Sequence, residues 1–190
     1  YTFRQGVQQR LGIEHFDDNI NINDLGYQAR NNYTQIRTAH TRTSSNLSWA
    51  RNNQFDIRGA LQENGDGFFT RGGVFISNRA TFNNLTSVTG RISHFYPGYD
   101  DLNSFGNGVY RIKEKTAVGL GFDSNSAKVM SFGVGLGYEE EDLSGDSYYY
   151  HANVNWRPLD GLSVGAGVRY LDRDGWLLHQ ENRNFTTFSA

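Results

Sequence analysis

The sequence predicts an all-β protein, and three observations favour an antiparallel transmembrane β-barrel. Apolar residues alternate with small or polar ones along several segments, the connections between these segments alternate in length, and the composition suits strands. The chain has 190 residues, with 22 Gly, 11 Tyr and 13 Phe but only two Pro and no Cys. Many aromatic residues between glycine-containing turns are typical of strands rather than helices.

The clearest alternation lies in residues 132–138, where Phe132, Val134, Leu136 and Tyr138 share one face and three glycines the other. Successive side chains of a strand point to opposite faces, so the pattern predicts one apolar and one small face. A soluble sandwich would instead have a large apolar inward face and a polar outward face. The pattern therefore favours the curved wall of a barrel. Similar patterns occur at 1–14, 117–122, 148–157 and 163–170.

The expected connections also favour a barrel. Short turns are expected near 43–46, 83–84, 124–127 and 158–161, and longer polar loops near 16–26, 63–67, 96–107, 139–147 and 173–183. Outer-membrane barrels have this asymmetry between tight periplasmic turns and longer extracellular loops. About ten strands result, each long enough to cross a bilayer at a tilt. We expect residues 1–190 to be one segment of a larger barrel, incomplete at both ends, which missing strands or a partner protein would complete.

Two segments fit the alternation poorly. Within 28–42 the apolar residues do not share a face, and within 47–61 the face that holds Trp49 also carries Arg51. Either a bulge shifts the phase there, or these strands contact another protein or a plug. The sequence leaves both interpretations open.

Several short motifs resemble a known family. Residues 23–32 (Asn-Asp-Leu-Gly-Tyr-Gln-Ala-Arg-Asn-Asn) resemble a strand entry in an uncharacterised bacterial outer-membrane barrel domain. Residues 99–101, followed by Gly-Asn-Gly at 106–108, are similar to another loop-to-strand passage of that family. This domain usually follows a module like the family-nine carbohydrate-binding domains. The resemblance implies an outer-membrane location and a preceding N-terminal module, but it implies no chemistry.

Basic residues gather on the small or polar faces of the expected strands. Alternation places eight of them in the lumen: Arg10, Arg71, Arg79, Arg111, Lys113, Lys115, Arg157 and Arg169. A basic lumen would attract anions and select for them if it is open. Alternatively, these residues pair with acids of strands outside the chain or fill a closed barrel. The formal net charge of −2 does not indicate nucleic acid as a partner.

Oxygen-bearing side chains in the expected loops are candidates for a divalent-cation site. They are Asp17, Asn19, Asn21, Glu139 and Glu141. Ca²⁺ takes six to eight oxygen ligands, which acidic loops can supply. However, Ile22 stands where a calcium-loop signature requires glycine. Solvated loop tips, or cation bridges to lipopolysaccharide phosphates, are the competing interpretations, and no other cofactor is expected.

Aromatic residues cluster near the expected strand ends. Tyr138, Tyr148, Tyr150, Trp156 and Tyr170 would form interfacial girdles in a barrel, whereas in a sugar-binding protein they would stack on pyranose rings. The five histidines show no serine and orienting acid in one cluster, so we expect no enzymatic activity.

These observations predict a bacterial outer-membrane barrel that serves as a pore, an export conduit or a surface anchor with a basic lumen. Its expected partners are the lipid bilayer and lipopolysaccharide, together with another envelope protein if one completes the barrel. The alternative is a surface-exposed β-sheet module that binds glycans through aromatic residues. The need for detergent during extraction distinguishes the two.

Overall fold

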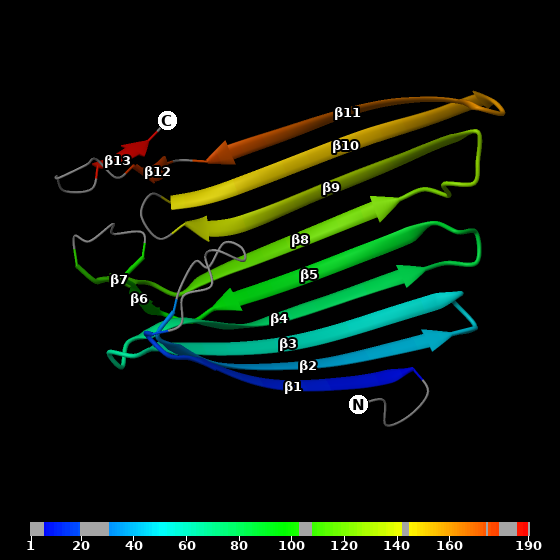
Figure 1. Ribbon diagram of the computed structural model, residues 1–190. Coiled ribbons are helices and arrows are strands. Elements are labelled where there is room, and N and C mark those ends of the chain that lie inside the picture. Colours follow the sequence, from blue (N-terminus) through cyan, green and yellow to red (C-terminus); the bar gives the residue numbers. More distant parts are fainter. Residues whose placement is uncertain are drawn as a thin grey trace.

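The computed structural model describes residues 6–19, 31–102, 108–141, 145–173, 175–178 and 186–189. Nine long strands form one antiparallel sheet in the order β1-β2-β3-β4-β5-β8-β9-β10-β11 (Figure 1). They are β1 Val7–Phe16, β2 Tyr33–Ser45, β3 Asn52–Asn64, β4 Phe69–Thr81, β5 Ser87–Phe95, β8 Lys115–Asp123, β9 Met130–Glu141, β10 Gly145–Leu159 and β11 Leu162–Arg173. The sheet is thus an up-and-down meander with β1 at one edge and β11 at the other.

Four shorter strands form two separate antiparallel pairs. Strand β6 (Gly98–Asp100) pairs with β7 (Tyr110–Ile112), and β12 (Gly175–Leu178) pairs with β13 (Thr186–Ser189). Both pairs lie at the same end of the large sheet (Figure 1). The prediction of an all-β antiparallel fold is confirmed, with nine strands in the large sheet where about ten were expected. The described residues contain no helix that is long and apolar enough to cross a membrane.

The connections at the two ends of the sheet differ in length. At one end, the intervals between successive strands of the large sheet are residues 46–51, 82–86, 124–129 and 160–161. The opposite end holds the longest intervals, 17–32 and 96–114, but also the short intervals 65–68 and 142–144. The expectation that the connections alternate in length is therefore wrong at these last two. Strand β3 continues to Asn64, β9 continues to Glu141 and β10 begins at Gly145, all within segments expected to be loops.

The two strands that fit the alternation poorly contain no bulge against β1 or against each other. The β1–β2 and β2–β3 registers are unbroken, and the irregularity lies between Gln62 and Glu63, where β3 faces β4. Trp49 and Arg51 precede β3, which removes them from its alternation. The mixed pattern of β2 itself is real, because Ile36 shares its face with Thr38 and His40.

The sheet has two chemically different faces. One of them, here called the apolar face, carries Leu11 (73% exposed), Leu120 (55%), Leu136 (51%) and Val168 (67%). Among the described residues, only Ala50 and Ala80 are buried apolar side chains. A soluble β-sandwich buries such a face against a second sheet. Here the described chain supplies no second layer, and its apolar side chains lie open. The opposite face, here called the polar face, holds the candidate site.

A candidate basic face and its hollow

The polar face carries more basic than acidic residues. The strand registers place eight described basic residues on it: Arg10, Arg37, Arg58, Arg71, Arg79, Arg91, Lys115 and Arg169. They place four described acidic residues there: Glu14, Asp56, Asp123 and Glu139. The sign of this face is thus opposite to the formal net charge of −2 of the whole chain.

Each of the four acids lies near a basic side chain. Lys115 Nζ lies 2.5 Å from Glu139 Oε1, which joins β8 to β9. The other pairs are Arg79–Asp123 and Arg37–Glu14, both at 3.5 Å, and Arg58–Asp56 at 4.0 Å. Four arginines have no ion-pair partner within the described part of the chain: Arg10, Arg71, Arg91 and Arg169. The excess positive charge on this face is therefore uncompensated by the described residues.

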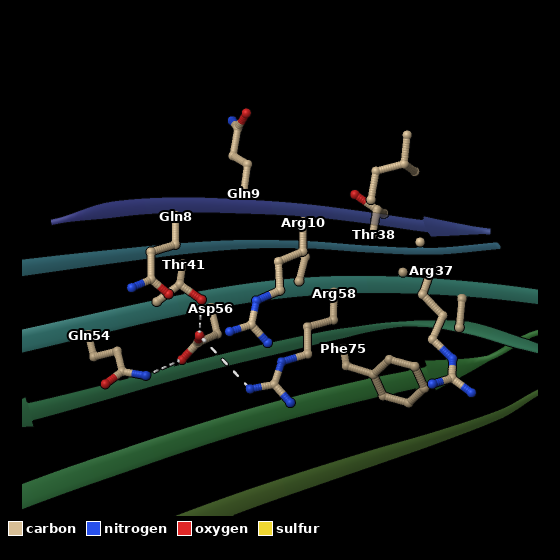
Figure 2. A pocket seen from close by; sticks show the side chains of 15 residues that line it. Gln8, Gln9, Arg10, Arg37, Thr38, Thr41, Gln54, Asp56, Arg58 and Phe75 are labelled. Carbon is tan, nitrogen blue, oxygen red and sulfur yellow. Dashed lines mark hydrogen bonds and ion pairs between the residues drawn. The ribbon is translucent and has the colours of Figure 1, made fainter. Parts of the chain in front are cut away.

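Three arginines of the polar face line a hollow of about 1210 Å³ over strands β1 to β4 (Figure 2). Arg10, Arg37 and Arg58 come from three neighbouring strands, and small residues stand between them. Ala39 lies between Arg10 and Arg58 in the register. Gly12 and Ala60 flank Arg37 in the same way. Because these short side chains do not fill the space between the guanidinium groups, the wall is hollowed at this place.

Asp56 is the acidic residue within the hollow, and its carboxylate has hydrogen-bond donors. The residue is 6% exposed. Thr41 donates from Oγ1 to Oδ1 over 2.6 Å, and Gln54 donates from Nε2 to Oδ2 over 2.9 Å. Figure 2 shows both hydrogen bonds and the longer ion pair to Arg58. The carboxylate is thus held by neutral donors from β2 and β3.

The glycines of β9 have a different role on the polar face. Gly133, Gly135 and Gly137 lie beneath the side chains of Asn153, His151 and Tyr149 of β10. A Cβ atom at Gly137 would overlap the Tyr149 ring, and one at Gly135 would overlap the His151 ring. The Tyr149 hydroxyl reaches β8, where a Cβ at Gly119 would lie 2.6 Å from it. These glycines therefore provide space for side chains of the neighbouring strand.

A second hollow of about 660 Å³ lies on the polar face near the short connections. Arg79 lines it and donates from Nη2 to Ser87 Oγ over 3.0 Å. Asn153 and Asn155 also line it. Both hollows therefore open on the polar face.

The structure brings together some of the sequence-predicted basic residues and separates others. Arg10, Arg71, Arg79, Lys115 and Arg169 lie on the polar face. Arg111 lies in the separate pair of β6 and β7, and Lys113 lies between β7 and β8. The Arg157 guanidinium donates to the carbonyl of Ser126 in the 124–129 connection.

Three basic residues of this face were not predicted from the sequence: Arg37, Arg58 and Arg91. Two of them lie on β2 and β3, where the apolar alternation is poor. The available signal was the alternation of polar residues, since Gln35, Arg37, Ala39 and Thr41 share one face whatever the opposite face carries.

The five aromatic residues singled out from the sequence lie on the apolar face. The rings of Tyr138 and Tyr148 lie 5.3 Å apart, and those of Tyr150 and Tyr170 lie 6.3 Å apart. Trp156 pairs with Met130 and Val164 near the short connections. Tyr148 and Trp156 are eight positions apart on β10, which is about 26 Å of strand. A strand tilted by about 40° would span about 20 Å between them, close to the apolar band of membrane barrels.

The loop candidates for a cation site are only partly described. Asn19 donates from its backbone N and from Nδ2 to Asp17 Oδ1, over 2.8 and 2.6 Å. The backbone hydrogen bond lowers the pKa of Asp17 below its ordinary value. Glu139 pairs with Lys115, whereas Asn21 and the side chain of Glu141 lie outside the described residues. Within the described residues, no group of three acidic, histidine or cysteine side chains could hold a metal ion.

A long-stranded antiparallel meander with one apolar face and one polar face is the arrangement found in the walls of membrane β-barrels. A family described as a domain of unknown function (DUF5916) matches residues 3–187, and the chain belongs to this family. The expectation of an uncharacterised domain family is thereby confirmed. No curated protein matches the chain.

A solved porin structure, refined at 1.8 Å resolution, is similar to this chain with a TM-score of 0.64 at 13% sequence identity. The match covers 97% of this chain and 56% of the porin chain. The chain thus spans little more than half the length of that porin. At this identity the likeness shows the fold alone.

Proposed function

We propose that this chain forms a large part of the wall of an outer-membrane β-barrel whose polar face lines an anion-favouring lumen. The observation that carries the proposal is the separation of the two faces. One face presents uncovered apolar side chains, and the other presents eight basic against four acidic residues among those described. Lipid and an aqueous lumen are the two environments that suit these faces.

The apolar face supports contact with lipid. Full burial of an exposed Leu, Val or Phe side chain is favourable by about 1.5–3 kcal/mol. Leu120, Phe132, Leu136 and Val154 are each between 38% and 55% exposed, so they would gain much of this on entering a bilayer. The tyrosines and Trp156 at the two ends of this band suit the membrane–water interfaces.

The edges of the sheet support a larger closed structure. Strands β1 and β11 each have one neighbour in the described sheet. An unpaired backbone group in hydrocarbon costs several kcal/mol, so a membrane wall must close. Further strands of the same protein, or a partner protein, would complete it. The 56% coverage of the porin chain is consistent with strands beyond this segment.

Within this proposal the protein resides in the envelope of a Gram-negative bacterium and contacts the bilayer and lipopolysaccharide. The proposal includes a preceding module like the family-nine carbohydrate-binding domains, as the sequence resemblance implies. The basic lumen favours a pore over an export conduit or a surface anchor, because a charged lumen acts on the solutes that pass through it.

Measurement of ion selectivity tests the pore. The full-length protein that contains this chain is inserted into a planar lipid bilayer, and the reversal potential is measured in a KCl gradient. We expect anion selectivity that decreases when Arg71 and Arg91 are both replaced by Glu. Arg42→Glu is the control, because Arg42 lies on the apolar-face side of β2. Cation selectivity would contradict the anion-favouring lumen, and a lack of conductance would contradict the pore.

The alternative function, glycan binding by exposed aromatic residues, has a separate test. The aromatic residues share their face with Leu136, Val154 and Val168, and a face of this composition suits lipid better than sugar. We expect extraction of the protein from cell envelopes to require detergent. Release by salt or alkaline buffer alone would contradict the barrel and favour the glycan-binding module.

A further inference from the structure

We propose that the hollow lined by Arg10, Arg37 and Arg58 is a binding site for organic carboxylates that carry a flat apolar face. This inference deepens the proposed function, because it names a class of solute for the basic face. It rests on that function only in requiring that the polar face be open to solutes.

The positions of the arginines suit a carboxylate. Arg10 and Arg58 are separated in the register by Ala39, so their strands lie about 10 Å apart. Both side chains extend from the wall into the same hollow (Figure 2). Guanidinium groups bind carboxylates through paired, charge-assisted hydrogen bonds. Two guanidinium groups on either side of a short alanine can therefore hold one carboxylate between them.

The guanidinium groups keep donors available for a ligand. Arg10 has no ion-pair partner among the described residues. Arg58 lies 4.0 Å from Asp56, which is too far for a hydrogen bond, and the Asp56 oxygens accept from Thr41 and Gln54 instead. Asp56 thus leaves the Arg58 donors available to a ligand.

Part of the remaining lining is apolar and suits the body of such a ligand. Phe75 lies directly opposite Arg58 in the β3–β4 register and lines the hollow. Its ring packs against Phe95 with 5.2 Å between centroids, which holds it in place. Ala39 and Ala60 add methyl groups to the same hollow. An aromatic carboxylate and a uronic acid both present a carboxylate next to a flat, CH-rich face, and this shared chemistry defines the ligand class.

Isothermal titration calorimetry on the detergent-solubilised full-length protein tests the site, using benzoate, glucuronate and acetate as probes. We expect benzoate or glucuronate to bind with one site per chain and at least tenfold more tightly than acetate. Whichever of benzoate and glucuronate binds more tightly shows whether the site prefers an aromatic ring or a sugar ring. Equal affinity for all three probes, or binding of none, would overturn the proposal.

Variants locate the binding. Arg10→Gln and Arg58→Gln are each expected to weaken binding about tenfold, since each removes charged hydrogen bonds. Arg10→Lys keeps the charge but loses the paired donors, so it should fall between the wild type and Arg10→Gln. Arg42→Gln makes the same charge change on the opposite face and should bind like the wild type. Equal affinity in the Arg10→Gln, Arg58→Gln and Arg42→Gln variants would overturn the assignment.

The calorimetric result is independent of the conductance. Anion selectivity without benzoate or glucuronate binding would support the pore and overturn this site. Binding without conductance would support this site and contradict the pore. Heat-dependent migration on SDS gels shows whether each variant is folded, and Arg10→Lys provides a milder change should Arg10→Gln fail to fold.

Discussion

Individual glycines on the polar face differ in what surrounds them. Gly137 lies beneath the Tyr149 ring, whereas a Cβ atom at Gly121 would meet nothing closer than 3.9 Å. Both residues lie in adjacent strands of the same sheet and on the same face. A methyl group added at the two positions should therefore have opposite effects on stability.

We expect Gly137→Ala to lower the free energy of unfolding by about 1–3 kcal/mol, because the Tyr149 ring must move. Gly121→Ala should raise it by about 0.5 kcal/mol, since alanine loses less backbone entropy in a strand. Urea unfolding of the protein folded into lipid vesicles measures both. A destabilisation by Gly137→Ala that persists when Tyr149 is also replaced by Ala would contradict the assigned contact.

Asp56 and Asp123 are a second contrasting pair at this scale. The Asp56 side chain is 9% exposed and accepts hydrogen bonds from Thr41 and Gln54. The Asp123 side chain is 55% exposed and lies 3.5 Å from Arg79 in an ion pair. Asp56→Ala should cost about 1–3 kcal/mol of unfolding free energy, because it leaves donors unsatisfied.

Asp123→Ala serves as the control for Asp56→Ala and should cost less than about 1 kcal/mol, since exposed ion pairs contribute little. The same urea unfolding measurement compares the two variants. Equal losses would show that the hydrogen bonds to Asp56 contribute no more than an exposed pair.

At the scale of single strands, alternation was informative where one face is fully apolar. Residues 132–138 predicted the faces of β9 correctly, because every second residue there is large and apolar. In β2 the apolar face itself carries Thr38 and His40. The positions of the apolar residues therefore could not show which residues of β2 share a face. Alternation groups Arg37 with Gln35 and Thr41, but the pairing with β1 and β3 shows which side of the sheet this group joins. Pairing is a long-range property that one strand does not contain.

The two faces of β8 allow the membrane assignment to be tested with adjacent residues. Leu120 lies on the apolar face and is 55% exposed, and Gly121 lies on the polar face. Leu120→Arg should impair assembly into vesicles and cost about 2–4 kcal/mol if it lies near the bilayer centre. Gly121→Arg adds the same charge to the polar face and should assemble normally. Assembly yield on SDS gels measures both, and normal assembly of Leu120→Arg would show that this face does not contact lipid.

For the whole molecule, the sequence predicted the meander and the chemistry of its faces better than it predicted the hollow. The hollow depends on Ala39 and Gly12 standing beside Arg58 and Arg37, and these residues are distant along the chain. Arg111 lies in the separate β6–β7 pair between β5 and β8 and not in the large sheet, although alternation alone predicted it to face the lumen. Local patterns identify faces, but neighbours across strands determine where side chains converge.

At the scale of the whole molecule, the two edges of the sheet allow its proposed closure to be tested. In the described sheet, β1 pairs only with β2, and β11 pairs only with β10, so half of the amides on each edge strand point away from the sheet. If further strands cover both edges in the full-length protein, these amides should exchange with deuterium as slowly as those of the central strands β4 and β5. Amide exchange measured residue by residue by NMR in detergent micelles tests this expectation. Slow exchange at β4 and β5 together with fast exchange at every second amide of β1 and β11 would show an open sheet. An open sheet could not remain in a bilayer, because its edge groups would lack hydrogen bonds.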